Sequence, residues 1–117
     1  MATWDTVREI ASPFPGVEET TTYGQPAFKV KGKLFAWLSP DQAAEGALAV
    51  RADPGELPLV LETAADRYFQ TQHYDGHPIL LIRLDRIDRE ELRERIEDSW
   101  LLRAPKRLVD EFVASAD

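Results

Sequence analysis

Apolar and polar positions recur along the chain with two different periods, and the changes of period divide it into helices and strands. The first apolar residues are spaced by three, four and seven positions, which is the period of one buried helix face. Thr3 stands where its side chain can cap this helix. Pro13 and Pro15 end it, because neither proline can continue a helix. The predicted buried positions are Val7, Ile10, Ala11 and Phe14.

From residue 17 to residue 51 the pattern changes to short strands separated by turn residues. Lys31-Gly32 separates two of these strands, and glycine tolerates the positive φ that a tight hairpin needs. With Lys31-Gly32 as a two-residue loop, Phe28 lies opposite Phe35 and Val30 lies opposite Lys33. Both phenylalanines then face the core. The strands predicted in this region cover residues 19–23, 27–30, 33–38 and 47–51.

The second half of the chain predicts two helices and two strands before a short final helix. One helix begins either with Asp53 as its cap or later, at Pro58. Strands are predicted over residues 68–72 and 78–84, and the second is the most apolar of the chain. The next helix has Asp88 as its cap and Glu91 three residues later, the spacing of a capping box. Its buried face carries Leu92, Ile96 and Trp100, and a last helix starts at Ala104-Pro105.

These elements predict an α+β fold in which helices pack on one face of an antiparallel sheet, because neighbouring strands joined by tight turns pair antiparallel. The expected order is helix, three or four strands, helix, two strands, helix, helix. A chain of 117 residues has the usual size of one domain, so residues 1–117 are predicted to form a single domain.

Several short motifs, in this order and spacing, resemble the MmcQ/YjbR-like family of small bacterial proteins. The resemblance implies an α+β fold similar to that of secretion chaperones. It also implies a DNA-binding role, since members are commonly described in that way by structural analogy. The matching motifs are Pro15-Gly16-Val17-Glu18-Glu19, Pro26-Ala27-Phe28-Lys29-Val30, Gly32-Lys33-Leu34-Phe35-Ala36, Tyr74, Leu84, the helix start from Asp88 to Leu92, and Ser99-Trp100 with Leu102.

The charge of the chain argues against a general affinity for nucleic acid. The net charge is −7 and the isoelectric point is about 4.8, so the surface as a whole repels phosphate. Binding to DNA or another polyanion then requires a local basic patch, because lysine and arginine bind phosphates by displacing counterions. Two basic clusters provide the candidate residues, and the alternative role of the hairpin lysines is to protect an exposed hairpin from aggregation. The candidates are Lys29, Lys31, Lys33, Arg103, Lys106 and Arg107.

Other chemistries are less well supported by the residues. No serine stands in a nucleophile motif, and Ser99 is interpreted as a small packing residue in a helix. His73, Asp75 and His77 would share one side of a strand and could bind a metal ion, but Gly76 and the following proline favour a turn. We therefore expect no catalytic residues, no metal site and no cofactor. The acidic helix 88–98 is interpreted as a solvent-exposed face with ion pairs.

Three functional hypotheses remain open. The first is a non-catalytic domain that binds DNA or another polyanion through the two basic clusters. The second is a protein-interaction or adaptor module that uses its sheet or an edge strand. The third is a small-molecule or metal site near residues 73–77. Tyr74, beside the predicted turn, is the candidate aromatic residue on a functional surface. The chain contains no cysteine, signal peptide or long apolar run, so the cytoplasm is the expected location.

Overall fold

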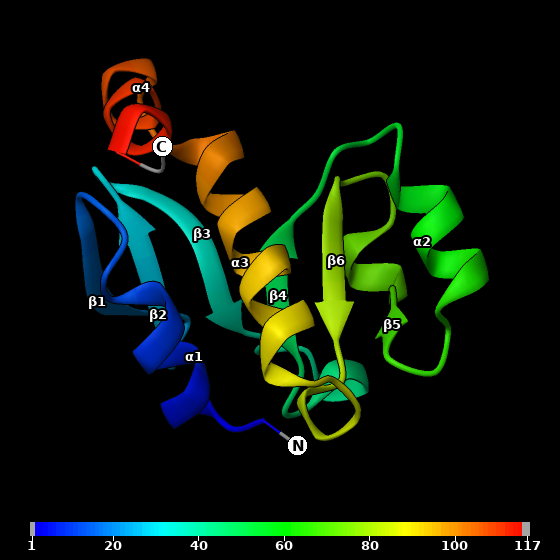
Figure 1. Cartoon of the computed structure of the whole chain (residues 1–117). Helices are drawn as coiled ribbons and strands as arrows, with labels where there is room; N and C mark the ends of the chain where they lie inside the picture. The colour runs from blue at the N-terminus through cyan, green and yellow to red at the C-terminus, as the bar shows by residue number, and fades with distance from the viewer. Residues whose placement is uncertain (1, 116–117) are drawn as a thin grey trace.

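Within residues 2–115, which this computed structural model describes, a six-stranded antiparallel sheet has four helices packed against one face (Figure 1). The strands lie in the order β1-β2-β3-β4-β6-β5. The predicted α+β class, the antiparallel pairing and the helices on one face are confirmed. In chain order the elements are α1 (Trp4–Ala11), β1 (Val17–Thr22), β2 (Gln25–Val30), β3 (Lys33–Leu38), η1 (Gln42–Ala44), β4 (Leu48–Arg51), α2 (Leu57–Thr63), β5 (Tyr68–Phe69), η2 (Gln72–Tyr74), β6 (Ile79–Ile82), η3 (Leu84–Arg86), α3 (Arg89–Arg103) and α4 (Lys106–Ser115).

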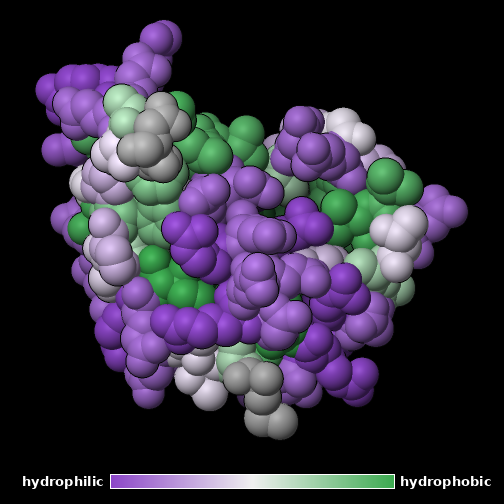
Figure 2. Space-filling model, viewed as in Figure 1, coloured by the Kyte–Doolittle hydropathy of each residue, from purple (hydrophilic) through white to green (hydrophobic). Residues whose placement is uncertain are grey.

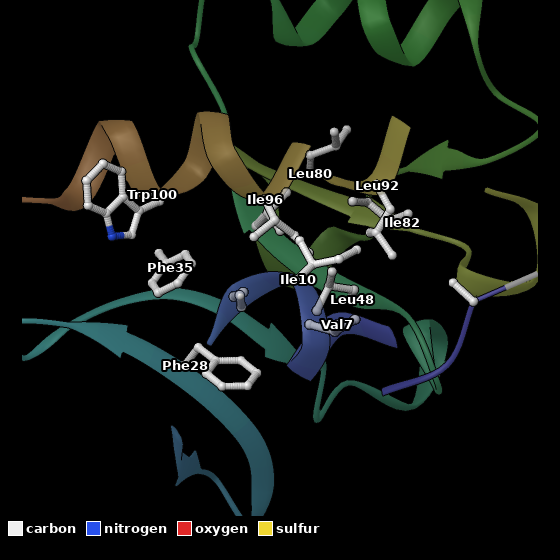
Figure 3. Close-up of a cluster of buried hydrophobic side chains, with 14 of the residues drawn as sticks. Val7, Ile10, Phe28, Phe35, Leu48, Leu80, Ile82, Leu92, Ile96 and Trp100 are labelled. Carbon is white, nitrogen blue, oxygen red and sulfur yellow. The ribbon is translucent and has the colours of Figure 1, made fainter. Parts of the chain in front are cut away.

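The main core lies between the sheet and the helices (Figure 3). The helix α3 crosses β3 and β4, and α1 packs beside it. Strand residues that face this core alternate with residues on the opposite face, as the period of two requires. Each large side chain that is fully removed from water contributes about 1.5–3 kcal/mol. The largest side chains of this core are Phe28, Phe35, Leu48, Tyr68, Leu80, Ile82, Ile87, Leu92, Ile96 and Trp100.

A smaller apolar cluster covers the opposite face of the sheet, beneath the loops that contain η1 and η2. Tyr74 belongs to this cluster and is only 4% exposed, so the prediction that it is a surface aromatic is wrong. Its hydroxyl lies 2.8 Å from Ser39 Oγ, which is also buried. Thr71 Oγ1 donates to Asp41 Oδ2 at 2.6 Å and ties the two loops together. The turn residues beside Tyr74 in the sequence gave no sign of this distant partner.

The β2–β3 hairpin has the predicted turn but a different register. Lys31 and Gly32 both have positive φ, +49° and +82°, and Val30 pairs with Lys33 as predicted. Phe28, however, lies opposite Ala36, because Phe35 is an extra residue that forms a β-bulge. The predicted Phe28–Phe35 pairing is therefore wrong. Both rings still face the helices, because the bulge places Phe35 and Ala36 on the same side of the sheet.

Beside the bulge, a side chain of α3 connects β3 with β4. Ser99 is fully buried, and its Oγ donates to the carbonyl of Phe35 at 2.5 Å. The same oxygen accepts from the backbone N–H of Arg51 at 2.8 Å. The β3–β4 ladder ends one residue earlier, at Ala36 and Val50. Ser99 thus joins the two strands where their own hydrogen bonds stop, which is more than the packing role expected for it.

The boundaries of α2 and β5 and one capping contact of α3 differ from the predictions. The helix α2 begins at Leu57, with Pro58 in its first turn, while the Asp53 carboxylate accepts from the N–H of Gly55. The strand β5 contains only two residues, because the chain turns into η2 after residue 71. In α3 the cap at Asp88 is confirmed, since its carboxylate accepts from the N–H of Glu91. The Glu91 carboxylate does not complete a capping box and instead binds Arg67 and Tyr68.

Candidate functional site

Both predicted basic clusters lie at one end of the sheet, where the β2–β3 turn meets the start of α4 (Figure 1). The contact is made at Gly16, which precedes β1. A Cβ built on Gly16 would lie 3.3 Å from Lys31 Cε and 2.7 Å from Leu108 Cδ1. The hairpin turn and the first turn of α4 are therefore neighbours, although 77 positions separate these two side chains in the sequence. Figure 2 shows hydrophilic side chains projecting at this corner of the molecule.

A further cation at this end, Arg51, was not among the predicted site residues. It is the last residue of β4, and its Nε donates to the carbonyl of Leu34, at the start of β3, at 3.4 Å. Its guanidinium carbon lies 5.2 Å from the centroid of the Trp37 ring. We call this region the basic end and define it by seven residues: Lys29, Lys31, Lys33, Arg51, Arg103, Lys106 and Arg107.

The seven cations differ in how far neighbouring carboxylates offset their charge. Lys106 Nζ lies 2.8 Å from Asp110 Oδ2, in an exposed i,i+4 ion pair. Such pairs contribute little and exchange readily for another anion. Lys29 lies opposite Glu18 on β1, so a negatively charged residue is its neighbour on the next strand. Among the ion pairs formed within residues 2–115, none includes the other five cations.

The segment considered for metal binding does not form the strand that such a site requires. Residues 72–74 form the short helix η2, and Gly76 has a φ of +82°. The alternating positions 73, 75 and 77 therefore do not share one side of an extended strand. Within the part of the chain that the structure describes, no group of three or more histidine or acidic side chains is arranged to hold a metal ion.

A polar network that sequence reasoning missed connects β5 with α3. The hydroxyl of Tyr68 and the Nε of Arg67 both donate to Glu91 Oε2, and Arg95 Nε donates to the Tyr68 oxygen at 3.0 Å. Burial and the nearby Glu91 raise the pKa of Tyr68. Burial opposes ionisation of Glu91, but hydrogen bonds from Arg67 and Tyr68 lower its pKa overall. This network holds the edge of the sheet against α3.

The acidic face of α3 is otherwise the exposed, ion-paired surface that its alternating charges predicted. Arg93 Nη1 lies 3.3 Å from Glu97 Oε1, four residues further along the helix. Arg89 pairs with Glu9 of α1 at 2.8 Å and links the two helices. Glu91 and Arg95, which are also four residues apart, both contact Tyr68 instead.

Comparison with known proteins now places this arrangement in a family. The family model described as YjbR matches residues 12–102, which run from the end of α1 to the last turn of α3. The chain belongs to the YjbR family. The matched region includes Ser99, the hairpin lysines and Arg51, while α4 with Lys106 and Arg107 lies beyond it. The resemblance seen in the sequence is thereby confirmed.

Relatives of this YjbR protein support the family and the fold without assigning an activity. Uncharacterized proteins of Mycobacterium tuberculosis and Mycobacterium bovis are 33% identical to it and align over 99% of both chains. The crystal structure of protein DR2400 of Deinococcus radiodurans, with the domain DUF419, has a TM-score of 0.73. It is 23% identical and covers 87% of this chain and 78% of its own, so it shows a shared fold. No helix within residues 2–115 has the length and apolar character needed to cross a membrane.

Proposed function

We propose that this YjbR protein binds the phosphate backbone of DNA through the basic end. The observation that carries the proposal is the meeting of the hairpin turn with the first turn of α4 beside Gly16. It gathers seven of the fourteen lysines and arginines of an acidic protein at one end of the sheet. Cations grouped in this way can neutralise several phosphates together, even though the net charge of the molecule is −7.

The exposed cations that form no ion pair with another residue of the range 2–115 are the best places to test this proposal. Lys31 lies in the hairpin turn, Lys33 begins β3 and Arg107 lies in the first turn of α4, and all three are exposed. Substitution of these three residues by alanine removes charge without opening the core. A matched control is Arg86→Ala, which removes an exposed positive charge from η3, at the other end of the sheet.

The experiment is fluorescence anisotropy of a labelled duplex of random sequence at about 50 and 200 mM salt. Each phosphate contact adds about 0.9 to the slope of log affinity against log salt, so the triple variant should lose roughly three from the slope. The Arg86→Ala variant should keep the wild-type slope. Absence of wild-type binding at the lower salt concentration, or equal slopes for wild type and triple variant, would refute the proposal.

A second candidate function, protein interaction, is favoured by the edge strand β1. It is six residues long and, in the described residues, pairs only with β2, whereas the opposite edge strand β5 has two residues. An exposed edge of this length can accept an added strand from another chain. We test this by light scattering over a range of concentrations and by hydrogen exchange of the β1 amides. A protein that stays monomeric, with those β1 amides that point away from β2 unprotected at every concentration, would count against pairing through this edge.

A further inference from the structure

The strand β1 lies at one edge of the sheet and lacks the features that usually protect such an edge (Figure 1). Protein edges are often interrupted by a bulge or a proline, or covered by another element. Residues Val17–Thr22 contain no proline and keep a continuous register with β2. Four of these six residues are β-branched, which favours an extended strand. The edge of β1 is therefore regular enough to pair with a further strand.

The backbone groups of β1 that can pair with a further strand belong to every second residue. The carbonyl of Gly16 accepts from the N–H of Lys31 at 3.2 Å, and the ladder continues in the same register along β1 and β2. Because hydrogen-bonded pairs alternate in an antiparallel ladder, the even-numbered residues of β1 direct their N–H and C=O groups toward β2. The odd-numbered residues direct theirs away from the sheet. Within the described residues, no other strand pairs with them.

The two glutamates of β1 each have a cation of their own chain beside them. Glu19 accepts from Nε and Nη2 of Arg8 in α1, both at 2.9 Å. Glu18 lies opposite Lys29 of β2. Charged residues on an edge strand oppose the pairing of two identical strands, because like charges directly opposite each other are destabilising. These neighbours reduce that repulsion, and the register of pairing decides whether glutamates meet at all.

One register joins two copies of β1 without placing glutamate opposite glutamate. Two identical antiparallel strands related by a two-fold axis place one residue opposite its own copy. With Thr20 on the axis, Glu18 lies opposite Thr22 of the second copy, and Glu19 lies opposite Thr21. An axis at Glu18 or Glu19 brings two like charges together, and an axis nearer either end leaves at least half of the strand unpaired. The Thr20 register also brings the outward backbone groups of Glu19 opposite those of Thr21, as a hydrogen-bonded pair requires.

We propose that two copies of this protein associate through their β1 edges, in an antiparallel pair centred on Thr20. The proposal rests on the second candidate function and deepens it by naming the partner. In this pairing Tyr23, whose side chain is 85% exposed, lies beside Val17 of the second copy. One short strand from each copy provides less contact than a standard protein interface, so we expect a dimer that forms only as the protein concentration rises.

The first arm of the test is disulfide cross-linking, which is specific because the chain contains no cysteine. Thr20→Cys places two thiols opposite each other at a pair without backbone hydrogen bonds. The Cα atoms of such a pair lie about 4.5 Å apart, within the range that a disulfide spans. This variant should form a covalent dimer under mild oxidation. Thr22→Cys alone should not, because the residue opposite it is Glu18, but a mixture of Thr22→Cys and Glu18→Cys should form the mixed dimer.

The second arm measures the monomer–dimer equilibrium by sedimentation equilibrium, with two matched substitutions on one face of β1. Thr22→Lys places a lysine opposite Glu18 at two symmetric positions, so the association constant should rise roughly 2- to 30-fold. Thr20→Lys brings two lysines together on the axis and should lower the association constant several-fold. Thr20 and Thr22 are both half-buried, so a general loss of strand stability would affect the two variants alike. In hydrogen exchange of the wild type, the amides of Glu19 and Thr21 should become protected as the concentration rises.

The outcomes separate this proposal from the functions proposed above. Cross-linking of Thr20→Cys, together with opposite effects of the two lysine substitutions, supports the pairing centred on Thr20. A wild-type dimer in which Thr20→Cys cross-links no better than Thr22→Cys overturns this pairing, while it leaves protein interaction as a function. A protein that stays monomeric at every concentration, or two lysine variants with the same effect on association, also overturns it. DNA binding is a separate readout, because antiparallel pairing leaves the two basic ends at opposite ends of the joined sheet.

Discussion

Replacement of Ser99 by alanine tests whether one hydroxyl of α3 connects β3 with β4. The substitution removes the acceptor of the Arg51 N–H and the donor to the Phe35 carbonyl. A buried backbone group left without a partner costs about 1–3 kcal/mol. The Phe35 carbonyl is buried and the Arg51 N–H is only partly buried, so the expected loss of unfolding free energy is about 2–4 kcal/mol.

This loss is large enough to be measured directly. An unfolding entropy of about 2.1 cal/mol/K per residue implies that each kcal/mol lowers the Tm of a 117-residue chain by about 4 °C. The Tm of Ser99→Ala should therefore fall by about 8–16 °C in calorimetry, with a matching loss in urea unfolding.

The control for this prediction is Ser115→Ala, at an exposed serine whose hydroxyl donates to the Phe112 carbonyl of its own helix. Its effect should stay within about 0.5 kcal/mol of the wild type. If Ser99→Ala proves as stable as Ser115→Ala, the hydroxyl of Ser99 does not connect β3 with β4.

Two further substitutions test the polar network and the loop before β1. Glu91→Gln should lower the unfolding free energy by about 1 kcal/mol at neutral pH. Because the pKa of Glu91 is lower in the folded protein, its contribution is complete above about pH 4.5 and is lost as the pH falls through the folded value. The difference from wild type should therefore vanish in strong acid, and a difference that is constant with pH would contradict this. Gly16→Ala should cost about 1–2 kcal/mol because φ is +72°, and slightly more than Gly46→Ala, which has φ +80° and open space around it. Equal thermal unfolding of these two glycine variants would show that the contact with Leu108 adds nothing.

Much of the fold could be predicted because local patterns determine it. In the sequence, α3 has a capping residue at Asp88 and apolar residues spaced so that one face is buried. The structure contains both features. Lys31-Gly32 specifies a two-residue turn on its own, so the hairpin was found without any knowledge of its neighbours. A strand or helix whose signals lie within a few residues can be predicted without knowledge of the rest of the molecule.

The features that were missed depend on partners far along the chain. Residues 34–38 are all apolar, so no alternation revealed that Phe35 is an extra residue in the strand. Tyr74 stands among turn residues, and only the buried hydroxyl of Ser39 explains its position. Arg51 is a single arginine at a strand end, and only the fold brings it to Trp37 and to the carbonyl of Leu34, beside the hairpin lysines. The basic clusters themselves were visible, but their meeting at Gly16 is a property of the tertiary fold.

The extra residue in β3 also determines which changes of the chain the basic end can tolerate. Deletion of Phe35 would keep Lys33 opposite Val30 and Leu34 opposite Lys29, but it would remove a buried ring and the carbonyl that Ser99 binds where β3 and β4 separate. Exchange of the lysines for arginines would leave the position of the charges unchanged. We therefore expect this family to vary the identity of its hairpin cations more freely than the length of the strand that carries them.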